Sequence, residues 1–190
     1  MQVLKESVRN AIIEGAIAEF FERGYQNANM RRIADSANIT VGNIYRYFRN
    51  KEALFNAVLQ PAQEALDDLE TFDKKLHITQ IDSLHDANQL VTYVMNVLSP
   101  YTKEIFIMIF NSTGTHYHQV KTQLESLVIN KIREYFPGKF DNYFLKVVAA
   151  SFIQSIFVVF KENIHNNEKI KDMLVKLIVF YFRDLNQRLY

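Results

Sequence analysis

A chain of 190 residues, of which 48% are hydrophobic and 23% charged, has the composition of a globular protein rather than a disordered one. Its formal net charge is only +1, so an anionic partner would have to be met by a local basic patch. The chain has no cysteine, which excludes disulfides, thiolate metal sites and a cysteine nucleophile.

Neither the N-terminal segment nor the most apolar segment indicates a membrane protein. "MQVLKESVRN" has no apolar region before a cleavage site, so no secretory signal is predicted. The longest strongly apolar run, residues 147–160, is shorter than the ~20 residues that span a bilayer and is typical of a buried core helix. We therefore expect a cytoplasmic protein with no membrane partner.

Helical patterns dominate the chain. Only five glycines and three prolines interrupt it, and no segment alternates convincingly with period two, so the predicted fold class is all-α. The expected helices span about residues 4–23, 30–37, 41–48, 51 onward to a kink or break at Pro61, 84–98, 100 onward, 117–136, 140–164 and 168–188. The segment beyond about residue 73 is poorly periodic and is predicted to be a connection. The predicted caps are Gly24 after the first helix and Asn29, Thr40, Asn50 and Ser99 at helix starts.

A basic patch coincides with two short predicted helices. Residues 30–51 contain five bases and one acid, Asp35, a local charge of +4. The bases are Arg31, Arg32, Arg46, Arg49 and Lys51. "SANIT" joins the two helices: Ala37 is small enough for a close crossing, and Asn38 tolerates a left-handed backbone. This pattern predicts a helix-turn-helix, whose second helix enters the major groove of DNA.

"IADSANITVGNIYRYFRNKEAL", preceded by "FFERGYQNANMRR", resembles the DNA-binding domain of TetR-family (tetracycline-repressor-like) transcriptional regulators. Asn29 stands where that family usually has Thr or Ser, and Asn38 where its turn usually has Gly. The resemblance implies an N-terminal three-helix DNA-binding domain, residues 1–50. It further implies a larger helical-bundle domain for ligand binding and dimerisation, residues 51–190.

The helix starting at Val41 has two chemically different sides. Ile44 and Phe48 share one side and are predicted to anchor it in the core. On the other side Gly42 permits close backbone approach, and Asn43 and Arg46 suit adenine and guanine edges. Val41 lies near the core side by periodicity and near bases by resemblance, and both readings stay open. The predicted DNA-binding residues are Arg31, Thr40, Val41, Gly42, Asn43, Tyr45, Arg46, Tyr47 and Lys51, of which the family resemblance assigns Tyr45, Tyr47 and Lys51 to the DNA backbone.

The last two predicted helices are apolar on nearly every side. A helix of this kind must be covered on every side, either centrally in a monomer or partly by a second subunit. The family resemblance favours a homodimeric four-helix bundle that presents two recognition helices to a pseudo-palindromic operator. The predicted dimer-interface residues are Ile153, Phe157, Phe160, Leu174, Ile178 and Tyr181.

Aromatic and scattered polar residues after residue 90 suggest a small-molecule site, although each one is also compatible with an ordinary core position. The predicted ligand-binding residues are Tyr93, Phe106, Phe110, His116, Tyr117, Phe152 and Ile156. His116 and His118 have a spacing that sends their rings to different helix faces, so no metal site is predicted. No nucleophile elbow, phosphate-binding glycine loop or paired carboxylates are recognisable, so we predict no catalytic residues and no cofactor.

The function predicted is that of a sequence-specific DNA-binding transcriptional regulator. It is expected to be a repressor released from a pseudo-palindromic double-stranded DNA operator by a small apolar or aromatic effector. The alternative is an all-helical small-molecule or lipid-binding interaction protein without DNA function, for which the basic patch would have no purpose.

Overall fold

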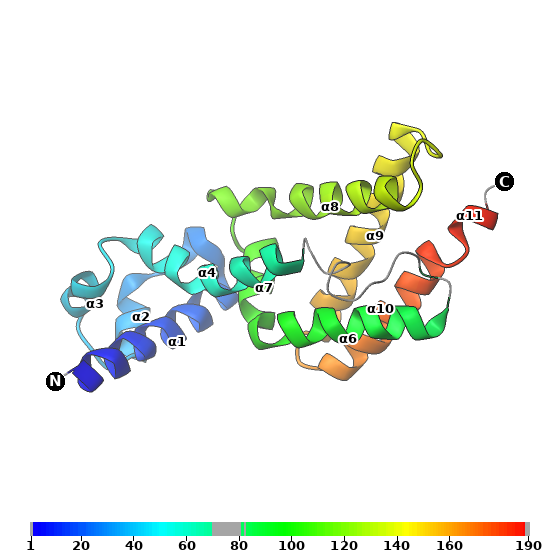
Figure 1. Ribbon diagram of the computed structural model, residues 1–190. Helices are drawn as coiled ribbons and strands as arrows, with labels where there is room; N and C mark the ends of the chain where they lie inside the picture. Colours follow the sequence, from blue (N-terminus) through cyan, green and yellow to red (C-terminus); the bar gives the residue numbers. More distant parts are fainter. Residues whose placement is uncertain (1, 70–80, 82, 189–190) are drawn as a thin grey trace. The chain divides into compact units, whose positions relative to one another are not determined.

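The computed structural model describes residues 2–69, 81 and 83–188, which form helices joined by turns and contain no strand (Figure 1). The all-α prediction is confirmed. The chain groups into two compact units, Met1–Glu64 with Tyr101–His118 and Ala65–Pro100 with Gln119–Tyr190. This grouping follows packing, whereas the division expected at residue 50 concerns which part binds DNA and stays a prediction.

The first unit contains the predicted helix-turn-helix. Its helices are α1 (Gln2–Asn27), α2 (Met30–Ser36), α3 (Val41–Tyr47), α4 (Lys51–Asp68, whose last residues belong to the second unit) and α7 (Thr102–Phe110). Helix α1 packs on α2 and α7, and α2 packs on α3. Helix α4 continues through Pro61 without a break.

Local side-chain caps define where these helices begin. Asn29 accepts a hydrogen bond from the amide of Arg31, Thr40 from that of Asn43, and Asn50 from that of Ala53 at 2.7 Å. Each cap satisfies an amide that has no partner within its own helix. The three predicted caps are confirmed.

The core of the first unit is a stripe of fully buried side chains along α1. Ile12, Ala16 and Phe20 occupy it. Gly15 lies next to this stripe, and a Cβ atom there would lie 3.2 Å from Ser36 Oγ and 3.3 Å from the carbonyl oxygen of Ile33. Glycine therefore permits the close packing of α1 on α2.

Helix α1 is interrupted at Gly24, whose φ of +71° lies in the left-handed region. The carbonyls left without helical partners are satisfied from the end of α7. The Asn111 amide donates to the carbonyls of Phe20 and Phe21 at 3.1 and 2.7 Å, and the Tyr25 amide donates to the Asn111 carbonyl at 2.8 Å. The predicted left-handed cap at Gly24 is confirmed, although helical turns resume as far as Asn27.

The second unit is a helical bundle. Its helices are α6 (Leu84–Leu98), α8 (Val120–Tyr135), α9 (Asn142–Asn163), α10 (Asn167–Phe182) and α11 (Leu185–Arg188). Helix α10 packs on both α6 and α9, and α8 packs on α9. The buried residues of α9 and α10 therefore fill the interior of this single chain.

Several predicted boundaries are wrong. Residues Ser99–Tyr101 form a 3-10 turn and α7 starts after Tyr101 without a side-chain cap, so Ser99 does not cap that helix. Residues 168–188 are not one helix, because Asp184 has a φ of +50° and separates α11 from α10. The connection predicted beyond residue 73 begins outside the described residues.

Helix α9 is longer than its apolar run suggested. It has 22 residues, with a mean hydropathy of 1.9 over its most apolar window, and by length and composition alone it could cross a membrane. However, α9 packs against α8 and α10 and buries Leu145, Phe152 and Phe157 among other residues. Its most apolar window is 39% buried, so α9 has one packed side and one uncovered side.

Candidate nucleic-acid interface

Helix α3 separates its anchoring side from a solvent-exposed side, as predicted. Ile44 is fully buried, and Phe48 at the C-cap is buried as well. Gly42, Tyr45 and Arg46 are exposed, and the Tyr45 side chain is 49% accessible. Val41, Asn43 and Tyr47 are half-buried at the edges of this surface, so the position of Val41 stays intermediate between the two readings.

Gly42 has no steric explanation within the described structure. A Cβ atom at this position would meet only the Thr40 hydroxyl oxygen, at an ordinary contact distance of 3.9 Å. Glycine in a helix is less favourable than alanine by about 1 kcal/mol. The fold therefore gives no reason for the missing side chain, in contrast to Gly15.

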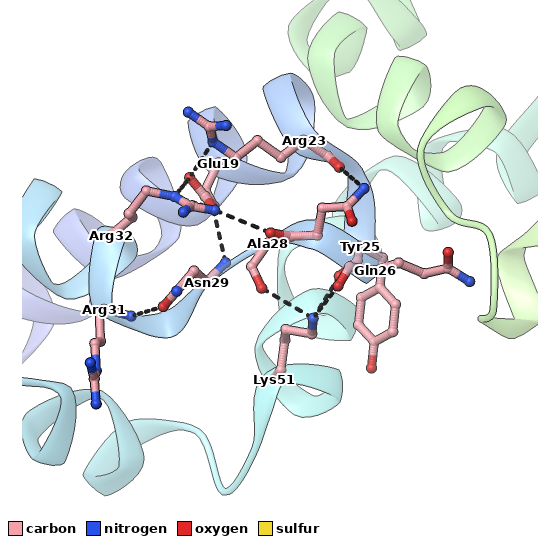
Figure 2. A network of polar contacts seen from close by, with 10 residues as sticks. Glu19, Arg23, Tyr25, Gln26, Ala28, Asn29, Arg31, Arg32 and Lys51 are labelled. Carbon is pink, nitrogen blue, oxygen red and sulfur yellow. Dashed lines mark hydrogen bonds and ion pairs between the residues drawn. The ribbon is translucent and has the colours of Figure 1, made fainter.

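A buried carboxylate organises the junction between α1 and α2 (Figure 2). Glu19 is only 7% exposed and accepts hydrogen bonds from Arg32 Nε at 2.8 Å and from the Asn29 amide at 2.8 Å. Arg23 lies 3.6 Å away. Burial by itself raises the pKa of Glu19, but the hydrogen bonds and charges of these partners outweigh burial and lower the pKa.

Glu19 was not predicted as a structural residue, although its spacing in the sequence places it among buried residues. Glu19 follows Ala16 by three residues and Ile12 by seven, so it lies on the buried stripe of α1. A carboxylate on such a stripe requires a cationic or hydrogen-bonding partner. Its partner Arg32 was counted in the basic patch, but its charge is paired within the protein.

Lys51 closes the C-terminal end of α1 (Figure 2). Its ammonium donates to the carbonyls of Tyr25, Gln26 and Ala28 at 2.7, 3.2 and 3.1 Å. The ammonium also lies 4.8 Å from the centroid of the Tyr25 ring. Burial lowers the pKa of Lys51, an effect that the charge of Glu19 partly offsets.

The predicted phosphate contact of Lys51 stays a prediction, and it would compete with these contacts inside the protein. An ammonium has three N–H donors, and carbonyl oxygens at a helix end are satisfied by such cations. All three donors of Lys51 have acceptors within the protein. Of the five bases in residues 30–51, Arg31, Arg46 and Arg49 remain exposed and outside the Glu19 and α1 contacts.

The predicted dimer residues face mainly inward. Ile153, Phe157 and Phe160 of α9 and Leu174 and Ile178 of α10 are buried within the single chain, and Tyr181 is half-buried. An all-round apolar pattern does not distinguish the faces of the two helices, so the dimer-interface residues stay a prediction. Tyr143, Val147, Val158 and Phe180 are the large hydrophobic residues of α9 and α10 that are exposed.

The predicted ligand residues fall into different units. Phe106, Phe110, His116 and Tyr117 belong to the first unit, and Tyr93, Phe152 and Ile156 to the second. Phe106 packs against Phe21 and Phe110, and Tyr117 packs against Phe55. In the described part of the chain, these contacts tie α7 and the turn after it to α1 and α4. No group of three or more potential metal ligands occurs among the described residues.

Known proteins match the N-terminal region of this chain. Residues 12–58 match the family model "Bacterial regulatory proteins, tetR family". An Escherichia coli K12 protein named probable acrEF/envCD operon repressor is 48% identical over 48 residues, 25% of this chain and 22% of that protein. The Rhodococcus jostii RHA1 HTH-type transcriptional repressor KstR2 is 26% identical over 130 residues, 65% of this chain and 62% of that protein. The first of these alignments thus spans about a fifth of the relative's own length.

Solved structures match the fold over most of the chain. A TetR-like transcriptional regulator from Rhodococcus sp. RHA1 has a TM-score of 0.61 at 15% identity, covering 90% of this chain and 92% of that one. SmeT, the repressor of the Stenotrophomonas maltophilia multidrug efflux pump SmeDEF, has a TM-score of 0.59 at 16% identity, covering 93% and 91%. At these identities the likeness concerns the fold alone.

The first unit carries a helix-turn-helix with an exposed α3, and the second unit is a helical bundle. The protein is therefore an all-helical protein with a helix-turn-helix domain. Through that domain, residues 12–58, the chain is similar to the tetR family of bacterial regulatory proteins. This is a family of regulators rather than of enzymes.

Proposed function

We propose that this protein is a sequence-specific DNA-binding transcriptional regulator, and specifically a repressor. The observation that carries the proposal is the exposed side of α3, where Gly42, Tyr45 and Arg46 are held outward by the buried Ile44 and Phe48. A large aromatic and a cation exposed beside a glycine that the fold does not require are explained by a partner surface that approaches the backbone closely.

The chemistry of this side fits the major groove. The Arg46 guanidinium can donate two hydrogen bonds to one guanine, and the Asn43 amide can pair with adenine. The Tyr45 and Tyr47 hydroxyls can donate to phosphates, which position a protein on DNA without specifying sequence. Arg31 and Arg49 add exposed positive charge on either side of α3 in the sequence.

The proposed regulator is a homodimer formed through the outer side of α9 and α10. Tyr143, Val147 and Val158 lie along one face of α9, and Tyr143 is 78% exposed. Phe180 on α10 is 66% exposed, and its neighbour Tyr181 has its hydroxyl 2.6 Å from Ser151 Oγ on that same face. A two-fold axis through this surface would pair two recognition helices with a pseudo-palindromic operator.

A small apolar or aromatic effector is proposed to release the repressor from its operator. The support comes from ring contacts, because aromatic side chains of α7 and its following turn contact α1 and α4 of the DNA-binding unit. A ligand that displaced these contacts would act only through a difference in its affinity for the two arrangements. A regulator of this kind acts in the cytoplasm, where its DNA lies.

Selection of bound duplexes from a random pool tests this function. The expected product is a palindrome with two half-sites, because a symmetric dimer presents two equal α3 surfaces. Phe180→Asp should abolish recovery of the palindrome and yield a monomer in sedimentation. Leu84→Asp, a charge placed at another exposed apolar residue, is the matched control and should change neither.

Recovery of no enriched duplex by a folded dimer would overturn the proposal and favour the all-helical small-molecule or lipid-binding protein. Enriched single half-sites, recovered equally by the wild type and Phe180→Asp, would keep DNA binding and overturn the dimer.

A further inference from the structure

The N-terminal turns of α1 carry two cations in line with the buried stripe. Lys5 and Arg9 precede Ile12 at helical spacing, and Ile12, Ala16 and Phe20 continue the same face. The face that packs the core therefore extends beyond the core as a short cationic segment. Both cationic side chains are exposed.

Arg9 is positioned at the C-terminal end of α3. Its guanidinium carbon lies 5.5 Å from the centroid of the Phe48 ring, and Phe48 is the C-cap residue of α3. A cation over an aromatic face is held in place while it keeps its hydrogen-bond donors available. Of the described carboxylates, none forms an ion pair with Lys5 or Arg9, in contrast to Arg32.

We infer that Arg9, with Lys5 one turn before it, binds backbone phosphates of DNA beside the groove that α3 occupies. This inference rests on the proposed DNA-binding function. Phe48 provides the surface on which the Arg9 guanidinium is oriented, and the rigid continuation of α1 fixes its distance from α3. Neither residue belongs to the interface predicted from the helix-turn-helix pattern.

The position of Arg9 favours phosphates over bases. Base edges are contacted by side chains of the recognition helix itself, whereas the helix before it crosses the DNA backbone. Arg9 belongs to α1 and stands beside the C-cap residue of α3. A planar guanidinium that is not paired with a carboxylate suits a phosphate, which it can bind with two parallel hydrogen bonds. Such a contact adds affinity without sequence preference.

The test compares the salt dependence of duplex binding for wild type, Arg9→Ala, Lys5→Ala and Arg9→Lys. Each phosphate contact contributes about 0.9 to the slope of log affinity against log salt, so each alanine variant of a dimer should lose about 2. Affinity for selected and random duplexes should fall by the same factor. Arg9→Lys should keep most of the slope, because it retains the charge. Lys169→Ala, which removes an exposed charge from α10, is the matched control.

The inference is overturned if Arg9→Ala folds normally and keeps the wild-type slope. It is also overturned if the variant only lowers the thermal midpoint, since Arg9 would then merely stabilise α3 through Phe48. A wild type that shows no salt-dependent duplex binding would instead overturn the proposed function itself. Ethylation interference should additionally show one fewer essential phosphate per half-site for Arg9→Ala than for the wild type.

Discussion

The two ends of α1 use the cations beside them in different ways. At the C-terminal end, Lys51 and Arg32 donate to carbonyls of residues 25–28 and to Glu19. At the N-terminal end, Lys5 and Arg9 are exposed and form no ion pair with a described carboxylate. Cations of the same chemical type therefore stabilise the fold at one end and are available to a partner at the other.

This difference changes the interpretation of the basic patch. A count over residues 30–51 includes Arg32 and Lys51, which the fold uses, and omits Lys5 and Arg9. Charge counted along the sequence does not show which cations are paired, because partners such as Glu19 lie outside the counted window. Available charge is a property of the folded surface.

The largest effect on stability is expected from Glu19→Gln. The neutral amide cannot pair with Arg32 and Arg23, so we expect the free energy of unfolding to fall by about 2–3 kcal/mol. Because the pKa of Glu19 is lowered in the folded protein, its contribution is present above the usual value of 4.5 and is lost as the pH falls through the lowered value. Denaturant unfolding from pH 7 to pH 3 should show the difference between wild type and variant shrinking in acid.

A pH-independent difference between the Glu19→Gln variant and the wild type would contradict the assigned ionic role. Glu22→Gln, on an exposed position of the same helix, is the control and should leave stability nearly unchanged.

A smaller loss is expected from Lys51→Met, which keeps an apolar stem but removes the ammonium. The carbonyls of Tyr25, Gln26 and Ala28 lose their donor, and stability should fall by about 1–2 kcal/mol. The salt slope of DNA binding should stay at the wild-type value, measured at a temperature where the variant is folded. A slope lowered by about 2 would instead support the phosphate contact predicted from the family resemblance.

The sequence alone predicted those features of the structure that neighbouring residues decide. The caps Asn29 and Thr40 and the anchors Ile44 and Phe48 follow from residue type and helical spacing over a few positions. The outer face of α9 was not predictable in this way, because its apolar residues surround the helix and packing against α8 and α10 decides which are buried. Asn111 was also missed as a partner of α1, because that contact joins residues about 90 positions apart.

Two glycines of the first unit also differ in whether the packing around them requires a missing side chain. A Cβ atom at Gly15 would press on Ser36 and Ile33, whereas one at Gly42 would meet only Thr40 at 3.9 Å. Gly15→Ala should therefore destabilise the fold. Gly42→Ala should stabilise it by up to about 1 kcal/mol, through helix propensity alone.

The most direct test of α3 as the DNA-binding surface is to measure thermal stability and affinity for the selected duplex on Gly42→Ala. We expect opposite signs: a thermal midpoint equal to or above that of the wild type, and binding weakened roughly tenfold as the added methyl groups hold α3 away from the groove. A stabilised variant that binds the duplex as tightly as the wild type would show that this side of α3 does not approach DNA.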